Sequence, residues 1–169
     1  MTLSWAVVAS WLTDDKMKIS DEATPLRTIR LALFSILLIG MLGSVIELIL
    51  LSHYEDWRQW LPVILILLGL SVSGWHAVRS TALSVRLLQA LFICFMASGF
   101  AGIYFHYQGG AEFKLESNPS LRGWALFWET IRGKVPPLLA PGVMMQLGLI
   151  GLAYTYKHPA LKGAKERGE

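Results

Sequence analysis

The dipeptide His-Tyr ends two separate apolar segments of the chain, and acidic residues follow it each time. The first occurrence lies within LLSHYEDW at residues 50–57, and the second within IYFHYQGGAEF at residues 103–113. Imidazole and carboxylate groups gathered at one level can hold a divalent metal ion such as zinc, iron or copper. They can also transfer protons, because histidine titrates near neutral pH and burial raises the pKa of a glutamate. Either chemistry requires the two segment ends to lie close together.

Four residues of these two ends are the candidate metal ligands: Glu47, His53, His106 and Glu112. Steps of three or four residues back from Glu47 reach Ser44, Gly43 and Gly40, and the same steps back from His106 reach Gly102, Gly99 and Ser98. Membrane helices approach one another closely along faces of small residues. We therefore expect these two faces to meet and to bring Glu47 and His106 together.

Three interpretations of this His/Glu cluster stay open. It can be a metal site, although the spacing of its residues matches no established metal motif. It can be a proton or ion pathway that uses Glu47, because a carboxylate inside an apolar helix is costly unless it faces protein, water or a partner. It can also be structural, since His-Tyr suits a membrane interface and Glu47 can bond a neighbouring helix.

Four apolar stretches must position these residues, and they cover 31–51, 60–78, 87–107 and 137–156. Each is about 20 residues long, and a helix of that length spans the roughly 30 Å hydrocarbon core of a bilayer. Only 16% of the residues are charged, whereas a soluble domain has roughly a quarter. The sequence therefore predicts an all-α fold, an integral membrane four-helix bundle in a single domain. Its predicted spans are about 30–52, 60–78, 86–107 and 137–156.

Capping and stop signals predict where these helices begin and end. Thr24 can cap the first spanning helix, with Pro25 at its first position. Gly109 and Gly110 are a stop signal for the third helix. The start of the fourth helix is left open between Pro137 and Pro141, because either proline fits a first turn.

The third loop, at 108–135, is long enough to hold structure of its own. Its AEFKLE stretch alternates polar and apolar residues, as a short extended segment does. Ser120 can then cap a helix that Gly133 stops. Apolar residues at helical spacing would form one face of this helix: Leu121, Trp124, Ala125, Trp128 and Ile131. The pattern predicts a short amphipathic helix lying in the membrane interface.

The distribution of lysine and arginine predicts the orientation. These residues are more numerous beside the N-terminal segment, the second connection and the C-terminal tail than beside the other two loops. The excess predicts that both termini lie in the cytoplasm and that the third loop lies outside. In a bacterium, the chain would then be a multi-pass inner-membrane protein with this loop in the periplasm. The lipid bilayer is thus the first expected partner.

Several other features narrow the function classes. Cys94 stands alone within an apolar stretch, so neither a disulfide nor a CxxC redox pair is expected. The net charge of +3 does not suggest nucleic-acid binding, because the basic residues flank the apolar stretches. No hydrolase or nucleotide-binding motif is present in the sequence. His76 is expected to be a satisfied interfacial histidine, and His158 to mark the end of the last helix.

Three stretches carry a resemblance: ELILLSHYEDWRQWLP, YFHYQGGAEFKLESNPSLRGWALFWE and PPLLAPG…GLAYTYKHPAL. Over most of the chain from the first spanning helix onward, the sequence resembles a family of small uncharacterised bacterial four-helix integral membrane proteins. The resemblance implies a bacterial source and four spans. It implies no functional residue.

These observations favour a non-enzymatic protein, either an accessory membrane subunit or a metal-binding one, with its His/Glu cluster at the periplasmic face. Other membrane subunits are then expected partners, and nucleic acid is not. The alternative is a small transporter or channel that uses Glu47 as an ion or proton site. A third possibility is an enzyme that uses the cluster on a lipid or quinone, although nothing in the sequence specifies its substrate.

Overall fold

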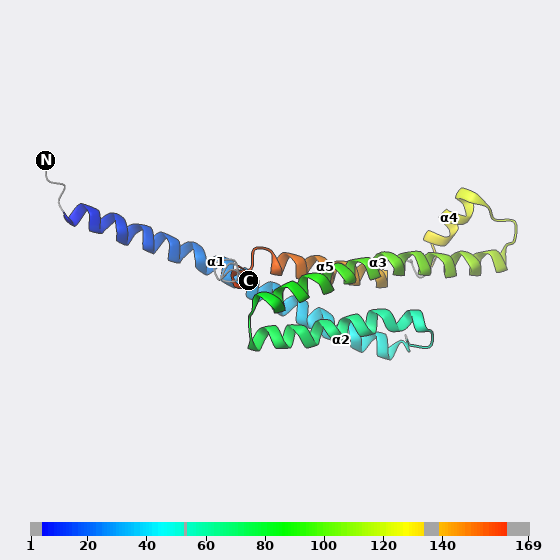
Figure 1. Ribbon diagram of the computed structural model, residues 1–169. Helices are drawn as coiled ribbons and strands as arrows, with labels where there is room; N and C mark the ends of the chain where they lie inside the picture. The colour runs from blue at the N-terminus through cyan, green and yellow to red at the C-terminus, as the bar shows by residue number, and fades with distance from the viewer. Residues whose placement is uncertain (1–4, 53, 134–138, 162–169) are drawn as a thin grey trace.

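The computed structural model describes residues 5–52, 54–133 and 139–161, which form helices and contain no strand (Figure 1). In chain order, the helices of this part of the chain are α1 (Trp5–Leu50), α2 (Trp57–Val78), α3 (Ala82–Ser117), α4 (Gly123–Ile131) and α5 (Leu139–Thr155). The all-α prediction is confirmed, with short connections between α1, α2 and α3.

Three helices are long and apolar enough to cross a membrane, namely Pro25–Leu50 within α1, all of α2, and α3. At 1.5 Å per residue, their 26, 22 and 36 residues extend over about 39, 33 and 54 Å. Large apolar side chains cover their outer faces, including Ile39 and Leu50, which are 71% and 78% exposed. Lipid acyl chains would cover such apolar faces, so the structure is compatible with a helical membrane bundle. The apolar helix of α5, Ala140–Thr155, is shorter than these three.

Two predicted helix ends are wrong. The helix α1 does not begin at Thr24 and Pro25, because it already runs from Trp5 and continues through Pro25. A proline removes one backbone hydrogen bond, and here this loss does not end the helix. The helix α3 also continues through Gly109 and Gly110 to Ser117, so the AEFKLE stretch is helical rather than extended.

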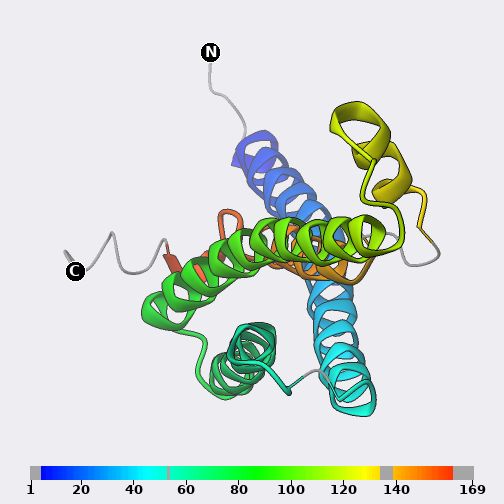
Figure 2. The ribbon, with the colours of Figure 1, turned by 90° about the vertical axis from the view of Figure 1, so that its right-hand side faces the viewer.

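Gly110 has a packing role in place of a stop. A Cβ atom on it would lie 3.1 Å from Cγ2 of Thr130 on α4, so the absent side chain lets α4 pack against the end of α3. Lys114 Nζ and Glu129 Oε2 join the same two helices at 3.5 Å. Figures 1 and 2 both show α4 and α2 on opposite sides of α3.

The short helix predicted in the third loop exists as α4, but it begins after Ser120. The hydroxyl of Ser120 donates to Asn118 Oδ1 at 2.6 Å, so it is occupied in the preceding turn. The chain then passes Gly123 at φ +51°, a left-handed conformation that favours glycine. The helix ends at Ile131, close to the predicted stop at Gly133. The start of α5 at Leu139 leaves Pro141 in its first turn, and Pro137 lies outside the described residues.

The predicted meeting of the small-residue faces of the first and third spanning helices is wrong. Gly40 on α1 and Gly99 on α3 pack against α5 instead, whereas Gly43 and Glu47 are exposed. A Cβ on Gly40 would lie 2.7 Å from Leu147, and a Cβ on Gly99 would lie 2.4 Å from Met145. Small residues therefore mark close approach as expected, but the helix that approaches is the last one in the chain.

The interface of α3 with α5 uses glycines from both helices. Phe92 of α3 packs against Gly148 and Gly151 on α5. A Cβ on Gly148 would lie within 3 Å of the Phe92 backbone oxygen, and a Cβ on Gly151 within 3 Å of the Phe92 ring. Phe92 and Phe95 are fully buried, with their rings edge to face at 5.8 Å. These rings fill the centre of the bundle, so α3 and α5 form its tightest pair.

Candidate functional site

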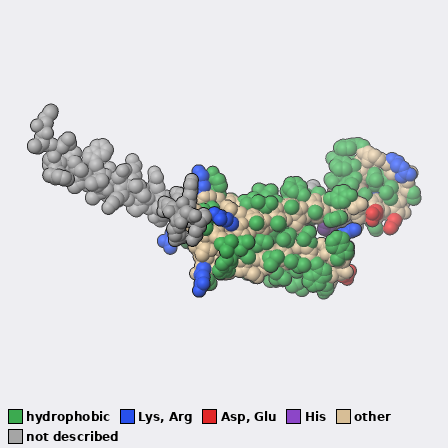
Figure 3. Space-filling view, viewed as in Figure 1, with side chains coloured by type: hydrophobic (Ala, Val, Ile, Leu, Met, Phe, Trp, Pro, Cys, Tyr) green, Lys and Arg blue, Asp and Glu red, His purple; other side chains and the backbone are tan. Residues whose placement is uncertain are grey.

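Charge separates along the bundle. We define the basic end as the end where the apolar parts of α1 and α3 begin and where α2 and α5 finish. Among the described residues, its basic members are Arg27, Arg30, Arg79, Arg86 and Lys157. Figure 3 shows Lys and Arg side chains there on the left, whereas the Asp and Glu side chains on this face lie at the right-hand end with a few further basic ones.

A buried polar contact ties three helices together at the basic end. His76 of α2 is only 3% exposed. Its Nδ1 lies 2.7 Å from Ser84 Oγ of α3, and its Nε2 lies 2.8 Å from the hydroxyl of Tyr154 on α5. A neutral imidazole that donates from Nδ1 and accepts at Nε2 satisfies all three groups, because Ser84 Oγ also donates to the Thr81 carbonyl oxygen at 2.9 Å. The expectation of a satisfied histidine is confirmed.

Aromatic rings surround this contact. The Phe34 ring of α1 lies 5.0 Å from the ring of Tyr154, and the His158 ring lies 5.1 Å from that of His76. His158 follows the end of α5 at Thr155, as predicted. All three long helices and α5 thus contribute a side chain within one small region.

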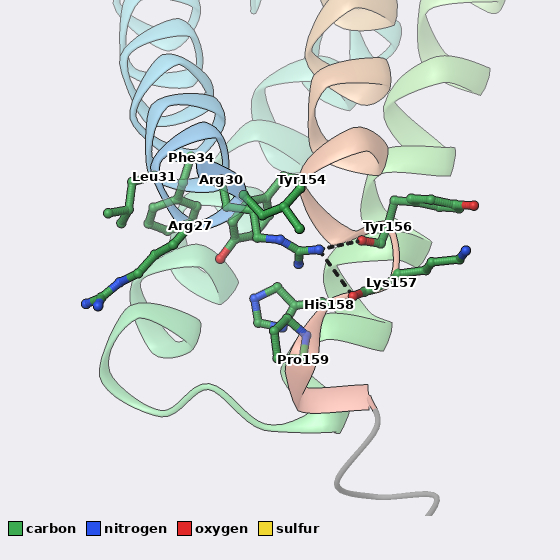
Figure 4. Close-up of a pocket in the computed structure, with 10 residues that line it drawn as sticks. Arg27, Arg30, Leu31, Phe34, Tyr154, Tyr156, Lys157, His158 and Pro159 are labelled. Carbon is green, nitrogen blue, oxygen red and sulfur yellow. Dashed lines mark hydrogen bonds between the residues drawn. The ribbon is translucent and has the colours of Figure 1, made fainter. Parts of the chain in front are cut away.

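Arg30 closes the end of α5. Its Nη2 donates to the carbonyl oxygens of Tyr156 and Lys157, each at 3.2 Å (Figure 4). A cation at this place satisfies carbonyls that the helix leaves without partners, and it complements the negative end of the helix dipole. Lys157 adopts φ +45°, the left-handed conformation in which helices commonly end. The other terminal nitrogen of Arg30, Nη1, is buried without a hydrogen-bond partner among the described residues.

A pocket of about 680 Å³ opens beside this cap (Figure 4). One wall comes from α1 and the other from the end of α5 and the residues that follow. Its lining residues are Leu26, Arg27, Arg30, Leu31, Phe34, Tyr154, Tyr156, Lys157, His158 and Pro159. The volume is in the range of small-molecule sites, and the walls combine apolar surface with three cationic side chains.

His158 adds no positive charge to this pocket at neutral pH. Burial is the main cause that lowers its pKa from 6.5 to about 4, and electrostatic interactions with His76 and Arg30 lower it further. Its Nδ1 accepts a hydrogen bond from the backbone N–H of Ala160 at 3.3 Å, which agrees with a neutral ring. The fixed cations of the pocket are therefore Arg27, Arg30 and Lys157.

The predicted metal ligands lie at the opposite end. Glu47 is exposed on α1, and His106 and Glu112 are exposed on α3. His53 lies outside the described residues. Among the residues that are described, no three histidine, cysteine or acidic side chains are placed to share a metal ion. The four-residue site stays a prediction.

Arg30 and Tyr154 are the site residues that sequence reasoning missed. In the sequence, Arg30 was considered only as one of the basic residues that predict the orientation of the chain in the membrane. The available signal was spacing, since Arg30 and Phe34 are four residues apart. Residues with this spacing share a helix face, but the spacing does not identify the neighbouring helix.

Comparisons with protein-family models, with curated proteins and with solved structures found no match to this chain. The resemblance to small bacterial membrane proteins stays a prediction for this reason. The function is therefore inferred from the geometry of the bundle and from its exposed polar groups.

Proposed function

We propose that this chain is a non-enzymatic accessory subunit of a bacterial inner-membrane assembly, with α5 as its fourth span and both termini in the cytoplasm. Three long apolar helices support the membrane location. α5 supports the fourth span because it runs antiparallel to α3, from Pro141 beside Gly102 to Thr155 beside Gln89. Its 17 residues extend over about 26 Å, which a slightly thinned bilayer accommodates.

The proposed orientation follows from the charges of the basic end. Lysine and arginine accumulate on the cytoplasmic side of membrane proteins, so the basic end is placed in the cytoplasm. α4 then lies on the periplasmic side. Its Trp124 ring stacks on the Phe127 ring at 5.1 Å and on the Trp128 ring at 5.8 Å. Such a surface suits the membrane interface, where aromatic rings concentrate.

The observation that carries the accessory role is the exposure of Glu47 on the outward face of α1. This carboxylate lies one turn inside the end of an apolar spanning helix. Gly43, one turn before it, meets no atom within 4 Å of an added Cβ. A charged group is unfavourable against acyl chains unless a partner or water covers it. A second protein's transmembrane helix that approaches at Gly43 and donates a hydrogen bond to Glu47 would satisfy both features.

Site-specific photo-cross-linking in membranes tests this role. A cross-linking residue at position 43 should give one adduct with a different protein, and Glu47→Leu should abolish it. The same residue at Ile64, which is 49% exposed on α2, is the matched control. Equal adducts from both positions, or an adduct of twice the mass of this chain, would contradict a specific foreign partner helix.

The same carboxylate also supports the second candidate, a small transporter or channel that uses Glu47 as an ion or proton site. Flux into proteoliposomes should then fall in Glu47→Gln, which keeps the shape of the side chain and removes its charge. Wild-type flux in this variant would dismiss the transport role.

The metal-binding form of the subunit is tested separately. Protein purified without chelator should contain a divalent metal that His106→Ala loses, if Glu47, His53, His106 and Glu112 form a site. Metal-free wild-type protein, with unchanged stability in His106→Ala, would remove this site.

A further inference from the structure

The pocket at the basic end combines an apolar wall with positively charged side chains. An anionic phospholipid has the complementary parts, namely apolar acyl chains and a negatively charged headgroup. Leu26, Leu31 and Phe34 give the pocket its apolar wall on α1, and both leucines are 59% exposed. Arg27 and Lys157 also line it, and their side chains point to opposite sides (Figure 4). The pocket lies where the apolar part of α1 begins, which is the depth of lipid headgroups beside a spanning helix.

Its charge is of one sign among the described lining residues, which include Arg27, Arg30 and Lys157 and no aspartate or glutamate. Arg30 is held in place by the carbonyl oxygens of Tyr156 and Lys157, so its planar guanidinium is already oriented. Its buried Nη1 has no acceptor within this part of the chain. A phosphate oxygen is the acceptor that best suits a guanidinium donor.

An aromatic side chain also favours a membrane ligand. Tyr156 is 65% exposed, and Lys157 Nζ lies 5.3 Å from the centre of its ring. Tyrosine and lysine of this kind place an apolar body among acyl chains and a polar tip among headgroups. A soluble anion would use the cations and leave the apolar wall and the tyrosine uncovered.

We infer that this pocket binds an anionic phospholipid, with the phosphodiester at Arg30 and an acyl chain along Leu26, Leu31 and Phe34. The exposed side chains of Arg27 and Lys157 would turn toward the phosphodiester on binding. This site is independent of the accessory role, because Glu47 lies at the other end of the bundle. Loss of the lipid site would leave cross-linking at position 43 unchanged, so the two proposals fail separately.

The experiment measures lipid retention and thermal protection of the full-length protein in a mild detergent. The probes are phosphatidylglycerol, phosphatidylcholine with the same acyl chains, and inorganic phosphate. Phosphatidylglycerol should be retained and should raise Tm, whereas the other two should have little effect. Removing a basic residue from a lipid contact weakens it about fivefold, so the double variant Arg27→Gln/Lys157→Gln should bind phosphatidylglycerol roughly 25-fold more weakly.

Arg86→Gln is the matched control, because Arg86 is an exposed cation at the same end and does not line the pocket. It should retain phosphatidylglycerol as the wild type does. Three results would overturn the inference: equal retention of both lipids, equal loss in Arg86→Gln and in the double variant, or equal protection by inorganic phosphate. The last result would indicate a soluble phosphate ligand. The double variant leaves Arg30 and the cap of α5 intact, so its folding is preserved and checked by circular dichroism.

Discussion

His76 on α2 and Tyr154 on α5 share a buried hydrogen bond of 2.8 Å, although 78 positions separate them in the sequence. The contact joins a helix near the middle of the chain to the last helix. Because His76 also contacts Ser84 on α3, one imidazole fixes the relative positions of three helices at the basic end.

The first prediction concerns this contact. Tyr154→Phe removes the hydroxyl and leaves His76 Nε2 buried without its partner. We expect the free energy of unfolding to fall by about 1–3 kcal/mol, which is typical when one partner of a buried hydrogen bond is lost. Thermal unfolding in detergent, followed by circular dichroism, measures the change. Tyr156→Phe is the control, since Tyr156 is exposed, and an equal loss in both variants would contradict the assigned role of Tyr154.

The second prediction concerns the cap of α5. Arg30→Gln removes both bonds to the carbonyl oxygens of Tyr156 and Lys157. We expect a loss of about 1–3 kcal/mol in the free energy of unfolding, because charged donors form the stronger hydrogen bonds. Arg27→Gln, three residues earlier on α1, should change stability much less. Wild-type stability in Arg30→Gln would show that the cap is dispensable.

The third prediction concerns the closest approach between α3 and α5. A Cβ on Gly151 would lie 2.3 to 2.5 Å from three ring atoms of Phe92, which is fully buried. Gly151→Ala should therefore destabilise the bundle by about 1–3 kcal/mol, as overpacking does. Gly74→Ala on α2 should be neutral or stabilising by up to about 1 kcal/mol, since Gly74 meets no atom within 4 Å. Similar Tm values for the two variants would contradict this packing.

The fourth prediction concerns pH. The pKa of His158 is lowered from 6.5 to about 4 in the folded protein, so between these values the unfolded chain binds more protons. His158 therefore contributes stability above pH 6.5, and this contribution is lost as the pH falls toward 4. Unfolding measured from pH 7 to pH 4 should show a smaller decline in His158→Gln than in the wild type. Parallel curves for the two proteins would exclude His158 as a source of the pH dependence.

The membrane class of the fold was predictable, whereas the order of neighbours was not. A run of about 20 apolar residues is typical of a membrane-spanning helix, so the three long apolar helices were predictable from the sequence. Gly40 and Gly99 correctly marked faces of close approach. Both glycines pack against residues of α5 rather than against each other, because a small residue permits close packing but does not determine which helix packs there.

The wrong helix ends have a related cause. Glycine ends a helix when it adopts a left-handed conformation, whereas Gly109 and Gly110 stay helical within α3, with α4 packed beside Gly110. At α5 the left-handed position is occupied by Lys157, which is not a glycine. The candidate site was missed because Arg30, His76 and Tyr154 are far apart in sequence, and only the packed bundle places them together.

The unbroken course of α3 also has a mechanical consequence. Its 36 residues make a rod about 54 Å long, anchored at one end by the Thr81–Ser84 capping box and carrying α4 at the other. Pivoting this rod by about 5° around Ala82 would displace Ser117 by about 5 Å over such a length. A small change of angle at the basic end would thus become a much larger movement of α4 at the opposite end of the bundle.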